Sequence, residues 1–201
     1  MKRGARLVLL VAVIAAIIFT LAGCAPGDAV ESPGYVSGDG TVTIFSESDQ
    51  HEPLVLAGTT FAGDPLDVAD YRGQVVLLNT WYAACPPCRA EAPDLVAADA
   101  RDDVQVIGIN GRDDAGTADA FDRTFDVEYP SIDDSNGDAV AALQGVVAVN
   151  AVPSSVILDP EGRIYARVIG RVEPSTLTSL LDEAAVRTGG VPTASDAGAN
   201  G

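Results

Sequence analysis

Apolar residues in the middle of the chain form short runs separated by amphipathic segments. The runs QVVLLNTWY, which begins at Gln74, and VQVIGIN, residues 104–110, are almost continuously apolar. Strands that are buried on both faces of a sheet show this pattern. Two further β-rich runs flank the turn Asp-Pro-Glu-Gly at 159–162 and predict a hairpin over residues 154–170.

Segments with helical spacing lie between and after these strands. We expect helices over residues 86–100 (beginning at Pro86 or Pro87), 117–125, 137–144 and 174–187. Pro93 lies inside the first of these helices, and we expect it to bend that helix. Short strands are expected at residues 41–45 and 128–132, and a hairpin or two short strands within residues 53–73.

The order of these elements is strand, helix, strand, helix, then a hairpin and a closing helix. A βαβ unit followed by a ββα unit packs naturally as a central mixed sheet with helices on both faces. The sequence therefore predicts an α/β fold with this sheet at its centre and an N-terminal β extension.

The N-terminal segment has the features of an export signal. Basic residues at positions 2, 3 and 6 precede an apolar run from Leu7 to Ala22, which is a little short for a membrane span. The motif LAGC, residues 21–24, resembles the lipobox of bacterial lipoproteins. That resemblance implies a signal peptide over residues 1–23 and a diacylglycerol on Cys24. An uncleaved signal anchor is the alternative, and both interpretations place the domain outside the cytoplasm and tethered to the membrane.

Composition divides the remaining chain into three parts. Residues 24–50 are rich in Gly, Pro, Ser and Asp and predict a flexible linker, and residues 189–201 predict a disordered tail. Residues 51–188 form the predicted domain, which can fill a core without disulfides because 47% of the chain is hydrophobic. Without the leader, nine basic residues face 29 acidic ones, a net charge of about −20 that argues against nucleic-acid binding.

The cysteine pair in CPPC, Cys85 and Cys88, is the main chemical signal. A tetrahedral zinc site needs four ligands, and His51 is the one histidine of the chain, so the sequence does not favour zinc. Haem attachment would need a histidine where Arg89 stands, and an iron–sulfur cluster would need two more thiolates from a second chain. A disulfide that closes so short a loop stabilises little. The pair is therefore interpreted as a redox centre that needs no metal or other cofactor.

The spacing also suggests a role for each cysteine. Residues three apart lie on the same side of a helical turn, and the helix dipole favours a thiolate at the helix start. Cys85 is therefore the predicted nucleophile and Cys88 the resolving thiol. Pro86 and Pro87 offer no N–H groups to the thiolate, which favours a reductant over an oxidant. This interpretation expects the two sulfur atoms at an accessible helix tip.

The motifs NTWYAACPPCRAEAP, residues 79–93, and AVPSSVILDPEGRI, residues 151–164, resemble the thioredoxin-like fold. More narrowly, they resemble the membrane-tethered ResA/TlpA/DsbE group of thiol-disulfide oxidoreductases, over residues 52–187. The resemblance implies that Glu91 assists proton movement, that Pro153 is a cis-proline facing the disulfide, and that the backbone of Val152 pairs with the substrate. It also implies that Trp81 packs beside the redox pair.

Each of these residues also has a structural interpretation. Glu91 fits an exposed helix residue, Pro153 a trans turn proline and Trp81 a plain core residue. The chain also departs from thioredoxin at two positions. Asn79 replaces the buried aspartate that serves the resolving cysteine, which leaves the proton role to Glu91, and Ala84 replaces a second tryptophan.

The resemblance implies a disulfide reductase for exported proteins. Its leading substrate would be apocytochrome c, and an integral membrane thiol electron donor would reduce it again. Three alternatives remain open: an oxidase that forms disulfides in secreted proteins, a non-enzymatic surface-binding domain on the same scaffold, and a peroxidase, which the CxxC spacing does not favour.

Overall fold

The structure is a computed structural model that describes residues 41–46, 52–148 and 150–187. The predicted signal peptide, Cys24, most of the linker, His51 and the C-terminal tail lie outside these residues. Among the described residues, no helix is both long and apolar enough to cross a membrane.

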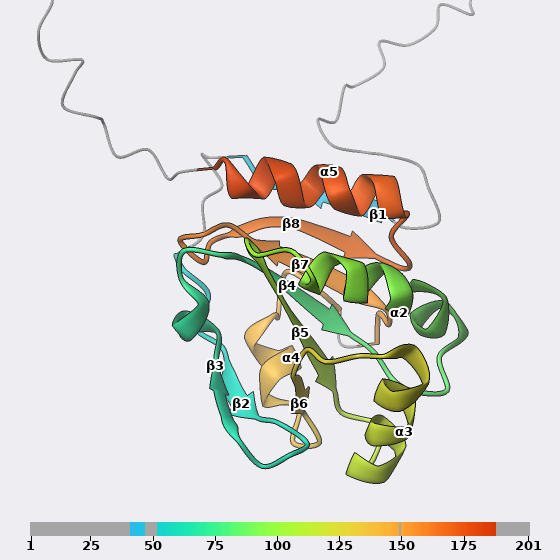
Figure 1. The fold of residues 1–201 in the computed structure, drawn as a ribbon. Helices are drawn as coiled ribbons and strands as arrows, with labels where there is room; N and C mark the ends of the chain where they lie inside the picture. Colours follow the sequence, from blue (N-terminus) through green and yellow to red (C-terminus); the bar gives the residue numbers. More distant parts are fainter. Residues whose placement is uncertain (1–40, 47–51, 149, 188–201) are drawn as a thin grey trace, which may run out of the picture. The chain divides into compact units, whose positions relative to one another are not determined.

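A six-stranded sheet forms the centre of the domain, with strand order β1-β8-β7-β4-β5-β6 (Figure 1). Strands β4, β5 and β6 run parallel to one another, whereas β1, β8, β7 and β4 pair antiparallel. The mixed sheet that the order of elements predicts is therefore confirmed. The strands are β1 (Thr41–Ile44), β4 (Val75–Thr80), β5 (Val104–Asn110), β6 (Ser131–Asp133), β7 (Ser154–Leu158) and β8 (Ile164–Ile169).

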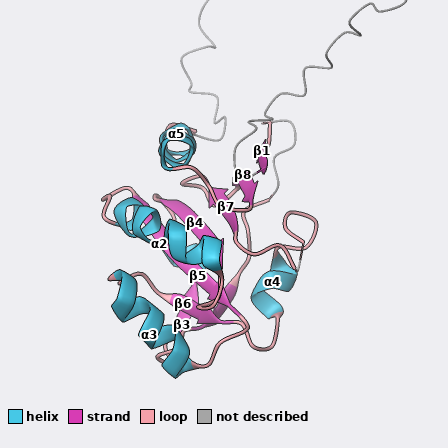
Figure 2. Ribbon diagram, turned by 90° about the vertical axis from the view of Figure 1, so that its right-hand side faces the viewer, coloured by secondary structure: helices cyan, strands magenta, loops and turns pink. Residues whose placement is uncertain are grey.

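Helices cover both faces of the sheet. Figure 2 shows α2, α3 and α5 on one side and α4 on the other. The second side also receives a small antiparallel hairpin, β2 with β3, followed by the short 3-10 helix η2. The bounds are α2 (Pro86–Asp99), α3 (Ala115–Phe125), α4 (Asp138–Ala142), α5 (Pro174–Ala185), β2 (Ala57–Thr59), β3 (Pro65–Asp67) and η2 (Val68–Tyr71).

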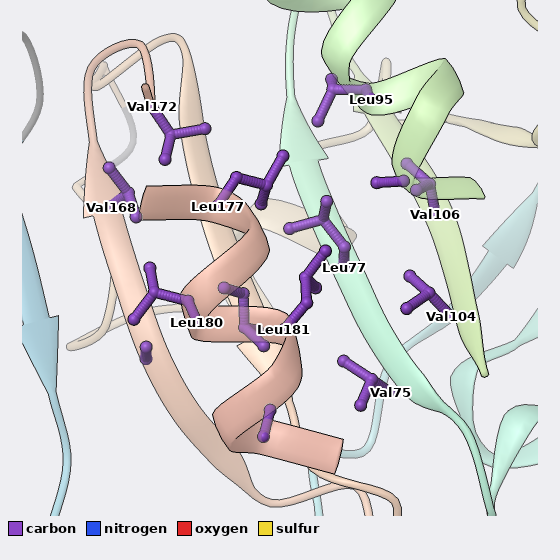
Figure 3. Packing of buried hydrophobic residues seen from close by; sticks show 14 of the residues in the cluster. Val75, Leu77, Leu95, Val104, Val106, Val168, Val172, Leu177, Leu180 and Leu181 are labelled. Carbon is purple, nitrogen blue, oxygen red and sulfur yellow. The ribbon is translucent and has the colours of Figure 1, made fainter. Parts of the chain in front are cut away.

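The apolar runs of the sequence become the centre of two cores. All six residues of β4 are buried, and alternate side chains point to opposite faces of the sheet. Val75 and Leu77 pack toward α2 and α5, whereas Val76 and Leu78 pack toward α4 and the β2–β3 hairpin. Figure 3 shows the first of these cores, in which the leucines of α5 lie against valines of the sheet.

Most of the predicted elements occur within one or two residues of their expected bounds. The strand expected at residues 128–132 is the exception, because β6 begins only at Ser131, where it pairs with β5 opposite Gly108. The helix α2 continues through Pro93 to Asp99. Whether Pro93 bends it stays a prediction.

Candidate redox site

The cysteine pair lies at the start of α2, shortly after the carboxyl end of the central strand β4. Cys85 and Cys88 form a disulfide with an S–S distance of 2.03 Å. Cys85 is the N-cap of α2, and its Sγ accepts a hydrogen bond from the backbone N–H of Cys88 at 3.2 Å. Pro86 and Pro87 occupy the first two helical positions, where missing N–H groups cost nothing. Local sequence therefore places one thiol at the helix start and the other one turn later.

Both cysteines are buried, which corrects the expectation of an accessible helix tip. Cys85 is 1% exposed and Cys88 is 2% exposed in the disulfide form. They share a buried cluster with Trp81 and Phe121, and Val152 packs against this cluster. The neighbours Ala84 and Pro86 are exposed, so the pair lies at the edge of the buried region. Apolar residues from distant elements cover the sulfurs, and the local motif does not reveal them.

Glu91 lies on α2, three residues after Cys88, and is 0% exposed. Its Oε1 accepts a hydrogen bond from Nδ2 of Asn79 on β4 at 2.9 Å. Burial raises the pKa of Glu91 to about 7, although hydrogen bonding to Asn79 and to the Val172 backbone, and the charge of the nearby Arg171, oppose that shift. The interpretation of Glu91 as an exposed helix residue is therefore wrong. The carboxyl can gain or lose a proton near neutral pH.

The loop that precedes β7 lies beside the end of β4 because Thr80 pairs with Ser154 in the antiparallel register. The Val152–Pro153 peptide bond is cis, so the trans alternative is wrong. The Thr80 hydroxyl accepts a hydrogen bond from the Ser154 N–H at 3.0 Å, and the Ser154 hydroxyl donates to the Ala151 carbonyl at 2.8 Å. Two hydroxyls that the sequence analysis did not single out thus hold the loop in place.

Trp81 continues directly from β4 and is 5% exposed. Its ring lies 4.4 Å from that of Phe121, centroid to centroid, and its Nε1 donates to the Ser131 hydroxyl at 3.3 Å. Gly108 makes this arrangement possible, since a Cβ at that position would lie 2.2 Å from the Ser131 Oγ and 2.6 Å from Trp81 Nε1. The predicted position of Trp81 beside the redox pair agrees with its membership of the cluster that holds both cysteines.

A second set of contacts fixes the turn just before Cys85. Asp113, in the loop after β5, accepts the backbone N–H of Ala83 at 2.6 Å and Nδ2 of the buried Asn110 at 2.8 Å. Arg89 donates to the Ala83 carbonyl at 3.2 Å. Sequence reasoning missed Asp113 because it lies 30 residues from Ala83 and no motif connects them.

Within the described ranges, no group of three or more His, Cys, Asp or Glu side chains is arranged to hold a metal ion. The chemical groups at the site are instead a disulfide at a helix start and a buried carboxyl with a pKa near neutrality. Such groups suit thiol-disulfide exchange, in which electrons move between sulfur atoms and protons follow.

The fold and the disulfide after β4 together define a thioredoxin-like protein of the class that exchanges thiols and disulfides. Residues 52–167 match the AhpC/TSA family, and the chain belongs to that family. Its relatives make the class more specific, because proteins named for thiol-disulfide exchange align with most of the domain. The chain is accordingly a thiol-disulfide oxidoreductase of the thioredoxin-like type.

Two curated relatives and one solved structure illustrate the similarity. The thiol:disulfide interchange protein HelX of Rhodobacter capsulatus is 29% identical over 131 residues, which cover 65% of this chain and 72% of HelX. The thiol-disulfide oxidoreductase ResA of Bacillus cereus is 23% identical over 128 residues, 62% of this chain and 72% of ResA. A secreted thiol-disulfide isomerase from Corynebacterium glutamicum aligns with a TM-score of 0.64 and 29% identity, covering 75% of this chain and 98% of that structure.

Proposed function

We propose that this protein is an extracytoplasmic disulfide reductase that acts on exported proteins and is held at the membrane by a lipid on Cys24. Its substrate would be apocytochrome c before haem attachment, and an integral membrane thiol donor would return it to the dithiol form. The resemblance to the ResA/TlpA/DsbE group motivates the substrate and the donor. The environment of Cys85 supports the direction of the reaction.

The observation that carries the direction is the small number of donors to Cys85. In the part of the chain that the structure describes, its Sγ accepts one hydrogen bond, from the Cys88 N–H. Pro86 and Pro87 have no N–H to add. A thiolate with few donors is a poorly stabilised reduced form, so the dithiol gives up its electrons readily.

The reaction consists of two exchanges. The Cys85 thiolate attacks one sulfur of the substrate disulfide, a mixed disulfide forms, and the other substrate sulfur leaves as a thiolate. Cys88, once deprotonated, then attacks the Cys85 sulfur, forms the Cys85–Cys88 disulfide and releases the second substrate sulfur. Two electrons pass to the substrate, which takes up two protons. Glu91 lies one helical turn from Cys88, and we assign it the role of taking the Cys88 proton.

The backbone of Val152 offers the contact for the substrate chain. Neither its N–H nor its C=O bonds to another described residue, although Pro153 and Ser154 on its C-terminal side do bond. An extended segment can pair with these two free groups as an added strand. Val152 also packs against the cluster that contains both cysteines, so a paired segment lies next to the disulfide.

Equilibration with glutathione tests the direction. A potential near or below about −270 mV, the value of thioredoxin, is expected for a reductase, whereas a value near −120 mV identifies an oxidase. Reduced protein should also accelerate the reduction of insulin. If the reduced protein does not accelerate insulin reduction, and if the Cys85→Ser substitution causes no loss of thiol-disulfide exchange, the non-enzymatic alternative holds. Turnover of hydrogen peroxide would instead identify a peroxidase.

Trapping in intact cells tests the substrate and the location. Cys88→Ser cannot resolve the mixed disulfide and should accumulate covalent complexes, and Cys85→Ser is the matched control that forms none. Recovery of apocytochrome c in these complexes is the expected result. Lipid labelling of the wild type should be strong, and Cys24→Ala should abolish it. A wild type that stays at the membrane without lipid label would instead indicate an uncleaved signal anchor.

A further inference from the structure

A pocket of about 290 Å³ lies beside the redox site. Trp81 and Val152 form the side nearest the cysteines, and apolar residues of the segment around α4, such as Leu143 and Val147, form its interior. Arg112 and the exposed Ala148 lie at its edge. The sequence analysis did not predict this pocket, since its lining comes from β4, β5 and the segments on both sides of α4.

The pocket and the proposed contact for the substrate chain have Val152 in common. We call the backbone of Val152, where the substrate chain would pair, the substrate edge. Val152 lines the pocket, and its backbone N–H and C=O groups, which bond to no other described residue, can pair with an extended chain. Side chains of an extended chain alternate between two faces, so a residue close to the substrate cysteine faces the pocket while the cysteine faces the disulfide. The volume of about 290 Å³ lies just below the range for small-molecule sites, about 300–1,000 Å³, and suits one side chain better than a cofactor.

Arg112 adds a positive charge to this mainly apolar pocket, whose lining also includes Asp134, a carboxylate that accepts hydrogen bonds from two backbone N–H groups of α4. Its guanidinium lies over the ring of Tyr82 at 4.5 Å from the centroid, and it forms no ion pair with any described residue. Asp113 and Asp114 follow it, but Asp113 bonds to Ala83 and Asn110, and Asp114 caps α3. In a chain with a net charge of −17, an arginine that has no acidic partner beside the substrate edge is suited to a carboxylate from outside.

We propose that this pocket binds a large apolar side chain of the substrate, at a position directly next to its reactive cysteine, and that Arg112 pairs with an acidic residue on the same segment. This inference rests on the proposed function and makes it more specific. The preferred substrate is an extended disulfide-bonded segment that carries an aliphatic or aromatic residue and a carboxylate beside its cysteine.

A peptide series tests this proposal. Each five-residue peptide has a central cysteine in a disulfide with glutathione and glycine elsewhere, and leucine is placed at each of the four flanking positions in turn. The rate constant for reduction by the reduced protein is measured. At one position next to the cysteine, leucine should raise this rate constant about tenfold over the rate constant for glycine. With leucine kept there, aspartate at a neighbouring position should give a rate about threefold higher than lysine.

Variants assign these preferences to the pocket. Ala148→Trp, which fills the pocket from an exposed position, should abolish the leucine preference, and Arg112→Gln should abolish only the preference for aspartate over lysine. Val186→Trp, just after the end of α5, and Arg123→Gln on α3 are matched controls at exposed positions, and both preferences should persist in them. As a measurement independent of the chemistry, fluorescence of Trp81, the one tryptophan of the chain, should change when Cys85→Ser protein binds the leucine peptide with serine in place of cysteine.

The outcomes separate this inference from the proposed function. If all peptides are reduced at equal rates, or if the leucine preference survives in Ala148→Trp, the pocket proposal is wrong and the reductase remains. If no peptide is reduced, including the all-glycine peptide, the proposed function itself fails. A Trp81 signal that does not distinguish leucine from glycine peptides also contradicts the pocket.

Discussion

Two buried regions of this domain are built from different kinds of residues. Between α5 and the sheet the interior is apolar, and leucines of the helix pack on valines of the strands (Figure 3). Around the end of β4 the interior contains polar groups that hydrogen-bond to one another: Asn79, Thr80, Glu91, Ser154 and Ser155. The first region contributes stability through burial, whereas the second holds groups whose burial is costly but gives them reactivity.

The difference predicts how each region responds to substitution. Truncation in the apolar region should lower the free energy of unfolding and leave the chemistry of the cysteines intact. Substitution in the polar region should change pH dependence or exchange rates, with smaller and sometimes opposite effects on stability. Four substitutions, from the largest expected effect to the smallest, test this distinction.

Leu181→Ala on α5 should give the largest loss of stability. Leu181 is 1% exposed, and removing its side chain should lower the free energy of unfolding by about 2–5 kcal/mol through lost burial and a residual cavity. Urea denaturation measures the loss. The equilibrium potential against glutathione should stay at the wild-type value, and a shifted potential would show that the two regions are not independent.

Glu91→Gln should change the pH dependence of stability. Because the folded-state pKa of Glu91 is about 7 and the ordinary pKa of a glutamate is about 4.5, the folded state holds a proton that the unfolded state releases between these pH values. The free energy of unfolding of the wild type should therefore fall as pH rises from about 4.5 through 7, by up to about 3 kcal/mol from this group.

Denaturation curves of wild type and Glu91→Gln at several pH values measure this effect. The advantage of the variant over wild type should grow through the window and then level off. Glu128→Gln, which removes an exposed carboxyl, is the control for the loss of one negative charge. A wild-type curve parallel to that of Glu91→Gln would contradict a raised pKa.

Gly108→Ala should disturb the tryptophan beside the cysteines. The added Cβ would lie 2.2 Å from Ser131 Oγ, so Trp81 or Ser131 must move, and we expect a loss of about 1–3 kcal/mol. The fluorescence of Trp81 should shift as its environment changes. Gly116→Ala on α3 is the matched control, because its Cβ would make only an ordinary contact at 3.6 Å and alanine favours the helix.

Asp113→Ala should have the smallest effect on stability, about 1 kcal/mol, because it removes the acceptor for the N–H of Ala83 and for Nδ2 of Asn110. Asp113→Asn keeps an acceptor oxygen and is the conservative comparison. If Asp113 positions the turn before Cys85, exchange by the alanine variant should be slower than exchange by the asparagine variant. Equal rates for the two variants would show that the hydrogen bond does not matter for exchange.

The sequence by itself determined the features that depend on short-range patterns. Continuous apolar runs identified β4 and β5, because a strand buried on both faces is mostly apolar, although each of these two strands ends in polar residues. The spacing of Cys85 and Cys88 placed both thiols on one helical turn, and the disulfide agrees with that placement. These features follow from backbone periodicity, which is the same in every fold.

Only the tertiary structure decided what surrounds the cysteines. The antiparallel register that sets Asn79 opposite Ser155 brings the loop before β7 to the end of β4, and the packing of α2 on that sheet turns Glu91 toward Asn79. The burial of Cys85 and the pocket beside Val152 likewise come from segments far apart in the chain. Such contacts depend on how the elements pack together, and no local pattern of residues records that packing.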